Sequence, residues 1–168
     1  MGLDIVSHRR VRLVGLSSEY LEGEDFLCEL LQPIFAHAFP EIPLIPAFIN
    51  EEFGFGYAIF QAREQGGEYA RTSYWGYSRF RGMLADLVLP EGREHWVPSD
   101  PFYEMAYMSD CEGFFTTSVC RKIAKDFDAH REAYAEKFFG FDYAVELYDE
   151  WARVFRDAAD TEGIVVYQ

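Results

Sequence analysis

Three stretches of the sequence carry the short runs of apolar, β-branched and aromatic residues that are typical of β-strands. Over residues 3–14, apolar residues are frequent and alternate around Arg12, which predicts one or two short strands. Residues 53–61 alternate aromatic side chains with glycine and predict a further strand. A closing strand is predicted over residues 164–167, directly after Gly163.

Longer segments show apolar residues three and four positions apart, the spacing that places them on one face of a helix. The first, residues 26–35, follows an acidic first turn and contains Pro33, which kinks or splits the helix. The second begins with Thr72 or Ser73 as its N-cap and ends before Pro90. The apolar stripe of the second helix is predicted to face the core and comprises Tyr77, Phe80, Leu84, Leu87 and Val88.

Two further helices are predicted in the second half of the chain. A long helix follows Gly113, and another begins at Asp142 and ends at Gly163. The residues predicted to face the core are Val119, Ile123, Phe127, Tyr134 and one of His130 and Arg131 in the long helix, and Leu147, Trp151, Val154, Phe155 and Ala158 in the last. About four helices and several short strands, in no regular alternation, predict an α+β fold. We expect a single compact domain over residues 1–168, with the helices packed on a small, mainly antiparallel sheet.

Prolines mark the connections between these elements. Pro40, Pro43 and Pro46 recur every three residues, the period of a polyproline II helix. Such a segment is either a stiff connector or a docking ligand for a proline-binding module. The apolar residues between the prolines favour the connector, because we expect them to enter the core. Residues 90–101 are predicted to form a loop.

The composition fits a folded domain with an acidic surface. The chain has 168 residues, of which 49% are hydrophobic and 18% aromatic, enough to bury a core. It has 29 acidic and 15 basic residues and a formal net charge of −14, which disfavours direct binding to nucleic acid or to an anionic membrane surface. The acidity either keeps the protein soluble or offers a face to a basic partner protein, as in mimicry of nucleic acid.

Cysteine usage and the hydropathy pattern favour a cytoplasmic protein. Cys28, Cys111 and Cys120 are odd in number and form no metal-binding motif, so we expect no disulfide framework, no structural metal and no cofactor. The sequence has neither a signal-peptide pattern nor an apolar stretch of 18 residues, so we expect no membrane partner.

The segment 109–113, Ser-Asp-Cys-Glu-Gly, is the first candidate site. In an extended backbone Asp110 and Glu112 point the same way, where they can bind a cation or act as an acid and base pair. Two carboxylates are too few for a metal site, however, and a tight turn tied by Ser109 or Asp110 is the structural alternative. The acidic neighbours of Cys111 disfavour a reactive thiolate there.

Hydroxyl side chains follow this segment at the predicted start of the long helix. Thr116, Thr117 and Ser118, together with free backbone amides, can bind an anion at the positive end of the helix dipole. Ordinary capping of the helix explains the same residues and is favoured, since one of them must cap the helix in any case.

Residues 69–81 form a locally basic stretch of the sequence, with arginines among aromatic residues. Arg79 and Arg81 can bind phosphate in bidentate fashion, and Trp75 can stack on a base, which suits a nucleotide-like ligand. We expect Trp75 and Arg79 to lie on a side of their helix away from the core. Alternatively, the arginines pair with the protein's own carboxylates.

Several of these motifs resemble a family of small uncharacterised proteins found in phages and prophages. The shared segments are Met-Gly-Leu-Asp at residues 1–4, Tyr-Ser-Arg-Phe at 77–80, Ser-Asp-Cys-Glu-Gly at 109–113, Lys-Ile-Ala-Lys-Asp-Phe at 122–127, and Tyr148, Trp151 and Phe155 in the last helix. The resemblance implies a phage-encoded protein that acts in the cytosol of the host cell. It implies no particular activity.

Two functions remain open at this point. The first is a non-catalytic accessory protein that binds a small anionic, nucleotide-like ligand or a host protein and so counteracts host defence. The expected ligand-binding residues are Trp75, Arg79, Arg81, Ser109, Asp110, Glu112, Thr116 and Thr117. The second is a small hydrolase or transferase that uses Asp110 and Glu112. Binding without catalysis is favoured, because the sequence has no recognisable nucleophile and base or metal constellation. A homo-oligomer is compatible with either function.

Overall fold

The computed structural model of the chain describes residues 2–17, 44–48, 57–64, 66–93, 95–108 and 113–167. Its central layer is a four-stranded antiparallel sheet with the strand order β5-β1-β7-β6. The strands are β1 (Gly2–His8), β5 (Tyr69–Ser73), β6 (Gly113–Phe115) and β7 (Ile164–Tyr167). Every residue of β7 is buried, because both faces of this strand are covered.

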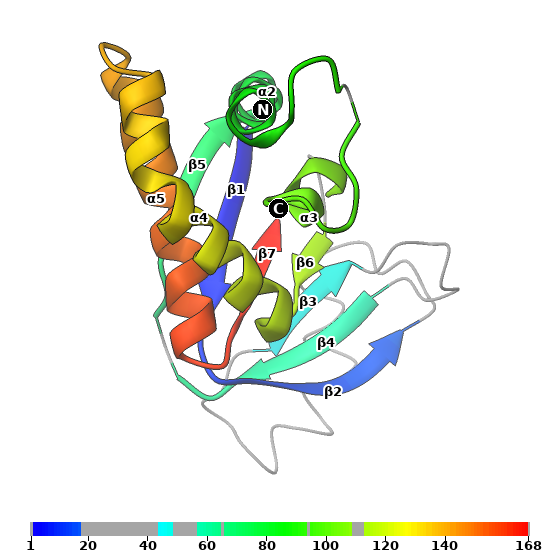
Figure 1. Cartoon of the computed structure of the whole chain (residues 1–168). Helices are drawn as coiled ribbons and strands as arrows, with labels where there is room; N and C mark the ends of the chain where they lie inside the picture. The colour runs from blue at the N-terminus through cyan, green and yellow to red at the C-terminus, as the bar shows by residue number, and fades with distance from the viewer. Residues whose placement is uncertain are drawn as a thin grey trace.

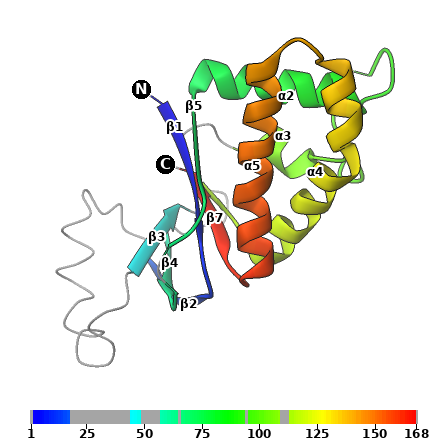
Figure 2. The same cartoon turned by 90° about the vertical axis from the view of Figure 1, so that its left-hand side faces the viewer.

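Helices cover one face of this sheet (Figures 1 and 2). They are α2 (Tyr74–Val88), the short α3 (Tyr103–Tyr107), α4 (Thr117–Lys137) and α5 (Asp142–Asp160). A tight turn joins α4 to α5, so the two helices run side by side in opposite directions (Figure 1). Near this turn, α2 lies across the first part of α5 (Figure 2).

The main core lies between the helices and the sheet and is rich in aromatic rings. Trp151 and Phe155 have no exposed surface, so their predicted place in the core is confirmed. The Trp151 ring stacks on Tyr77 of α2, with ring centroids 5.0 Å apart. Leu3 and Ile5 of β1 join the same cluster from the sheet. The stripes predicted for α2 and α5 therefore pack against each other and hold α2 in place.

A second, three-stranded sheet covers part of the other face of the central sheet (Figure 2). Its strand order is β2-β4-β3 and all its pairings are antiparallel. The strands are β2 (Val11–Ser17), β3 (Leu44–Phe48) and β4 (Tyr57–Ala62). Phe60 of β4 meets Phe114 of β6 edge to face, with centroids 5.0 Å apart, and Ala62, Ile164 and Val166 belong to the same smaller cluster. The contact explains why β7 has no exposed side.

These layers confirm the predicted α+β class, with four described helices and antiparallel strands. The second sheet and α3 were not predicted. The predicted helix over residues 26–35 lies outside the described residues, as does the beginning of the strand predicted over 53–61. In the part of the chain that the structure describes, no helix is long and apolar enough to cross a membrane.

The prediction of a stiff connector is wrong for residues 44–48, which belong to the second sheet. They form β3, and Pro46 stands opposite Ile59 of β4. Proline has no N–H to donate to a neighbouring strand, so it is tolerated at the edge of a sheet, and β3 is an edge strand. A period of three between prolines does not distinguish a polyproline helix from such an edge strand. Pro40 and Pro43 lie outside the described residues.

Candidate functional site

Two of the predicted ligand-binding residues, Trp75 and Arg79, lie on the first two turns of α2. The Oγ of Ser73 accepts a hydrogen bond from the backbone N–H of Gly76 at 2.9 Å, which confirms Ser73 as the N-cap. This cap fixes the register of the helix. Of the predicted stripe, Tyr77, Phe80 and Leu84 are buried, and Leu87 and Val88 are half-buried. Trp75 and Arg79 consequently face away from the core and are exposed.

Arg79 and Trp75 form a cation-π pair at the surface. The guanidinium carbon lies 5.5 Å from the centroid of the indole ring, and 71% of Trp75 is exposed. Among the described residues, no carboxylate pairs with Arg79. The indole face helps to hold the guanidinium in position without neutralising its charge. Arg79 therefore presents a positive charge on the surface of a protein with a net charge of −14.

Two adjoining cavities separate α2 from the turn between α4 and α5, and we call them together the aromatic groove. The smaller cavity has a volume of about 300 Å³ and lies beside Trp75. The larger has a volume of about 460 Å³ and contains Gly82 and Asp86 on its α2 side. The residues that line both cavities are Arg79, Met83 and Phe141. Arg79 is thus placed where the two cavities meet.

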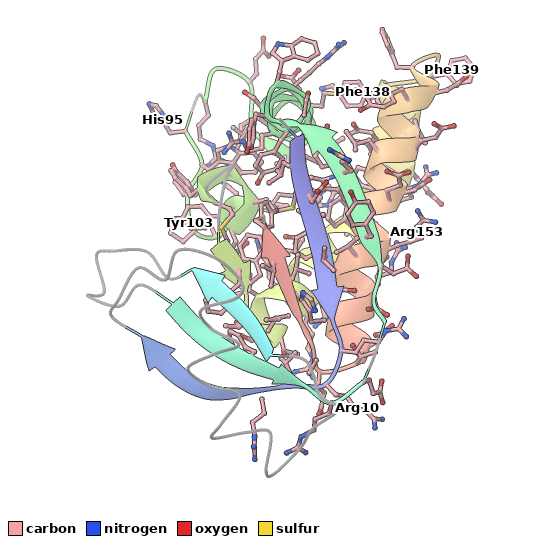
Figure 3. All side chains as sticks on the ribbon, turned by 180° about the vertical axis from the view of Figure 1, so that it is seen from behind. Arg10, His95, Tyr103, Phe138, Phe139 and Arg153 are labelled. Atoms are coloured by element: carbon pink, nitrogen blue, oxygen red, sulfur yellow. The ribbon has the colours of Figure 1, made fainter. Side chains whose placement is uncertain are left out.

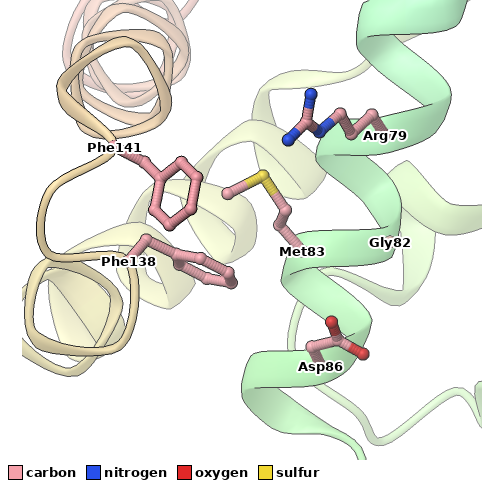
Figure 4. Close-up of a pocket in the computed structure, with 6 residues that line it drawn as sticks. All are labelled: Arg79, Gly82, Met83, Asp86, Phe138 and Phe141. Carbon is pink, nitrogen blue, oxygen red and sulfur yellow. The ribbon is translucent and has the colours of Figure 1, made fainter.

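Figure 4 shows how the larger cavity is built. Arg79 and Met83 extend from α2 towards Phe138 and Phe141, which come from the turn after α4. Phe138 is held in place by Tyr134, at a centroid distance of 4.6 Å. The walls are therefore mainly apolar, and the guanidinium group of Arg79 lies at one end of them.

The turn between α4 and α5 contributes aromatic residues that the sequence analysis missed. Phe139, Phe141 and Tyr143 are 88%, 60% and 67% exposed, and Phe139 lies at the tip of the turn (Figure 3). Gly140 has a φ of +87°, which lets the chain reverse direction within a few residues. A detectable signal was present in the sequence, because turns between helices are normally polar and this one is not.

The remaining arginines of the basic stretch stabilise the fold. Arg81 donates hydrogen bonds to the carbonyl oxygens of Ala106 and Met108, and its guanidinium lies 4.5 Å from the centroid of the Tyr77 ring. Arg71 pairs with Asp4 at 3.3 Å. Arg71 thus pairs with one of the protein's own carboxylates, as the alternative interpretation expected. Arg81 instead connects the end of α3 to α2.

Thr116 and Thr117 lie at the start of α4, whereas the groove lies at its far end (Figure 1). A helix of 21 residues is about 30 Å long, so these hydroxyls do not share a site with Trp75 and Arg79. Thr117 Oγ1 donates a hydrogen bond to the carbonyl of Gly163 at 2.6 Å and ties α4 to the beginning of β7. Thr116 Oγ1 lies 3.0 Å from Ser118 Oγ.

Ser109, Asp110 and Glu112 lie outside the described residues, so their roles stay predictions. Arg81 nevertheless binds the carbonyl of Met108, the residue before this segment. Nowhere in the described ranges do three or more His, Cys, Asp or Glu residues gather as they would around a metal ion.

The chain was compared with protein-family models, with curated proteins and with solved structures, and none of the three comparisons finds a match.

Proposed function

We propose that the protein is a non-catalytic binding protein whose aromatic groove takes a small anionic, nucleotide-like ligand. The observation that carries the proposal is the position of Arg79. It lines both cavities, lies over Trp75, and has no carboxylate partner in the described part of the chain. The sequence analysis singled out the same two residues for stacking and phosphate binding.

The lining of the smaller cavity suits a flat ring. Trp75, Phe141 and Tyr143 stand around it, and stacking of a base on an aromatic side chain contributes about 1–3 kcal/mol. A volume of about 300 Å³ lies at the lower end of the range of ligand pockets. A base or a nucleoside therefore fits better than a larger cofactor.

The charge of the groove favours a ligand with one anionic group. Arg79 is the one cation among the residues that line the smaller cavity, and Asp142 lines the same cavity. A guanidinium group binds a phosphate through two parallel hydrogen bonds. The surrounding acidity repels a polyphosphate or a nucleic acid chain. Nucleoside monophosphates are accordingly the class that matches both features.

Binding without catalysis agrees with the chemistry of this lining. Ser73 is the one hydroxyl nucleophile of serine or threonine type there, and its Oγ is engaged as the helix cap. A hydrolase or transferase that uses Asp110 and Glu112 is the alternative, and it depends on residues outside the described ranges. In the phage setting that the resemblance implies, sequestration of a nucleotide-like ligand would counteract host defence.

Calorimetric titration with the four common nucleoside monophosphates tests the proposal. We expect at least one to bind saturably, and Arg79→Gln to weaken it about tenfold or more, since a charged hydrogen bond contributes about 1.5–3 kcal/mol. Arg153→Gln is the matched control, because Arg153 is an exposed arginine on α5 away from the groove (Figure 3). Absence of binding by all four, or equal binding by Arg79→Gln, would contradict the proposal.

A further inference from the structure

Gly82 lies in the middle of α2 and leaves one wall of the larger cavity open. A Cβ added there would meet nothing within 4 Å, whereas a Cβ at Gly76 in the same helix would come within 2.2 Å of Thr72 Oγ1. Glycine inside a helix is about 1 kcal/mol less favourable than alanine. Packing within the described chain thus explains why residue 76 is glycine, but it does not explain why residue 82 is glycine. The open position suits the close approach of a group from outside the chain.

Four exposed aromatic side chains lie around the rim of the groove. Phe139, Phe141, Tyr143 and Trp75 are 60–88% exposed. At about 200 Å² for a whole aromatic side chain, they offer about 550 Å² per copy. Two copies that cover each other's rings would bury about 1,100 Å² in these side chains alone, close to the lower limit of a specific interface. A few flanking residues would complete such an interface.

The same surface carries both signs of charge. Arg79 lines both cavities, Asp86 lines the larger and Asp142 the smaller. Within the described ranges, none of these three side chains has an ion-pair partner. Across a two-fold axis such a patch complements itself, because the guanidinium of one copy meets a carboxylate of the other. This mixed patch can therefore bring together two chains that otherwise repel each other.

We propose that a second copy of this chain docks on the aromatic groove, with Phe139 of each copy in the larger cavity of the other. Phe139 is 88% exposed and follows Phe138, which lines that cavity. The cavity of about 460 Å³ is lined by Met83 and Phe141 and has room for a phenyl ring beside Gly82. An exchange of this kind buries the aromatic turn of both copies at once, as expected for an isologous dimer.

Self-association goes beyond ligand binding and can be tested separately from it. Neither Gly82 nor Phe139 lines the smaller cavity, which holds Trp75. Substitutions at these two positions therefore test the dimer and leave the lining of the ligand site in place. If they abolish association while nucleotide binding persists, with unchanged or higher apparent affinity, the two proposals stand or fall independently.

Sedimentation velocity from micromolar to near-millimolar protein is the experiment. We expect a reversible dimer that tightens as added salt screens the repulsion between two acidic chains. Gly82→Leu, which fills the cavity, and Phe139→Ser should each raise the dissociation constant about tenfold or more. Tyr107→Ser is the matched control, because it removes a 60% exposed aromatic ring from α3 and should leave the dimer unchanged.

Two results would overturn the inference. One is a chain that sediments as a monomer over the whole range, which would leave the groove to a different partner protein. The other is a dimer that both Gly82→Leu and Phe139→Ser leave intact. The Cβ of the leucine meets nothing within 4 Å, and leucine favours the helix over glycine, so failure to fold is not expected to obscure the outcome.

Discussion

Trp75 and Trp151 show two uses of the same side chain. Trp151 is fully buried against Tyr77, and its Nε1 has no hydrogen-bond acceptor among the described residues. Trp75 is 71% exposed and supports Arg79. The Trp151 ring holds α2 and α5 together, and the Trp75 ring forms part of the surface of the groove.

Truncation of Trp151 should therefore mainly affect stability, and truncation of Trp75 should mainly affect ligand binding. Trp151→Ala should lower the free energy of unfolding by about 3–5 kcal/mol, as expected for loss of a large buried aromatic ring. Trp75→Ala should lower it by less than about 1 kcal/mol and weaken nucleotide binding. Chemical denaturation followed by circular dichroism measures both changes. A loss below about 1 kcal/mol for Trp151→Ala would mean that this face of α5 is not core.

Asp157 on α5 is one residue through which acid should destabilise the chain. Its carboxylate accepts hydrogen bonds from Ser7 Oγ at 2.5 Å and Arg9 Nε at 2.8 Å. Burial by itself raises the pKa of Asp157, but the hydrogen bonds from Arg9 and Ser7 outweigh burial and lower the pKa below its ordinary value. A lowered pKa means that the folded state binds this proton less readily than the unfolded state does.

The contribution of Asp157 to stability should be complete at neutral pH. It should begin to fall near the unfolded-state pKa of about 3.9 and disappear as the pH passes below the lower pKa of the folded state. Asp157→Asn should be less stable at pH 7 and should lose less of its remaining stability on acidification. Unfolding free energies from neutral to acidic pH test this, and parallel curves for the two proteins would contradict it.

Among the elements, α2 links the core to the groove. Its buried face packs on α5, and its exposed face carries Trp75, Arg79 and Gly82. The cap at Ser73 fixes which residues belong to which face. A change on the exposed face should thus alter binding or local helix stability without disturbing the core.

Gly82→Ala tests the open position in this helix. Because the added methyl group meets nothing within 4 Å, the substitution should raise the free energy of unfolding by about 0.5–1 kcal/mol in dilute solution. Thermal or chemical denaturation measures the gain. Gly76→Ala is the contrasting variant and should destabilise, since its Cβ would collide with Thr72 Oγ1. A loss of stability in Gly82→Ala would show that the wall is not open.

Local signals in the sequence predicted the ends of α2 and the buried stripe of α5, because caps and apolar spacing act within a few residues. The same signals placed Trp75 and Arg79 on the exposed side. The groove itself was not predictable, since Arg79 meets Phe141 only after α2 packs across α5. Pro46 was misinterpreted for a similar reason: its place in an edge strand depends on pairing with β4, not on the spacing of neighbouring prolines.

At the scale of the whole molecule, ligand and second copy are expected to compete. Both proposed partners use Arg79, Met83 and Phe141. When two partners cannot bind the protein at the same time, each lowers the apparent affinity of the protein for the other, and the two factors are equal. The protein would then be a dimer when its ligand is scarce and a ligand-bound monomer when it is abundant.

Sedimentation in the presence of a binding nucleoside monophosphate measures this competition. We expect the dimer to dissociate progressively as the ligand approaches saturation, while orthophosphate at equal ionic strength has a much smaller effect. The Arg79→Gln variant should lose the response. A ligand that tightens the dimer would show that the two partners share the groove and do not compete for it.

The position of β7 also bears on how the chain is made. This strand lies between β1 and β6, so β1, which begins at Gly2, pairs on one side with residues 164–167. During synthesis the backbone hydrogen-bonding groups on that side of β1 stay unpaired until residues 164–167 have left the ribosome. Pairing across such a sequence separation is slow, and an unpaired strand edge favours misassociation. A nascent chain of this protein should therefore depend on molecular chaperones until β7 closes the central sheet.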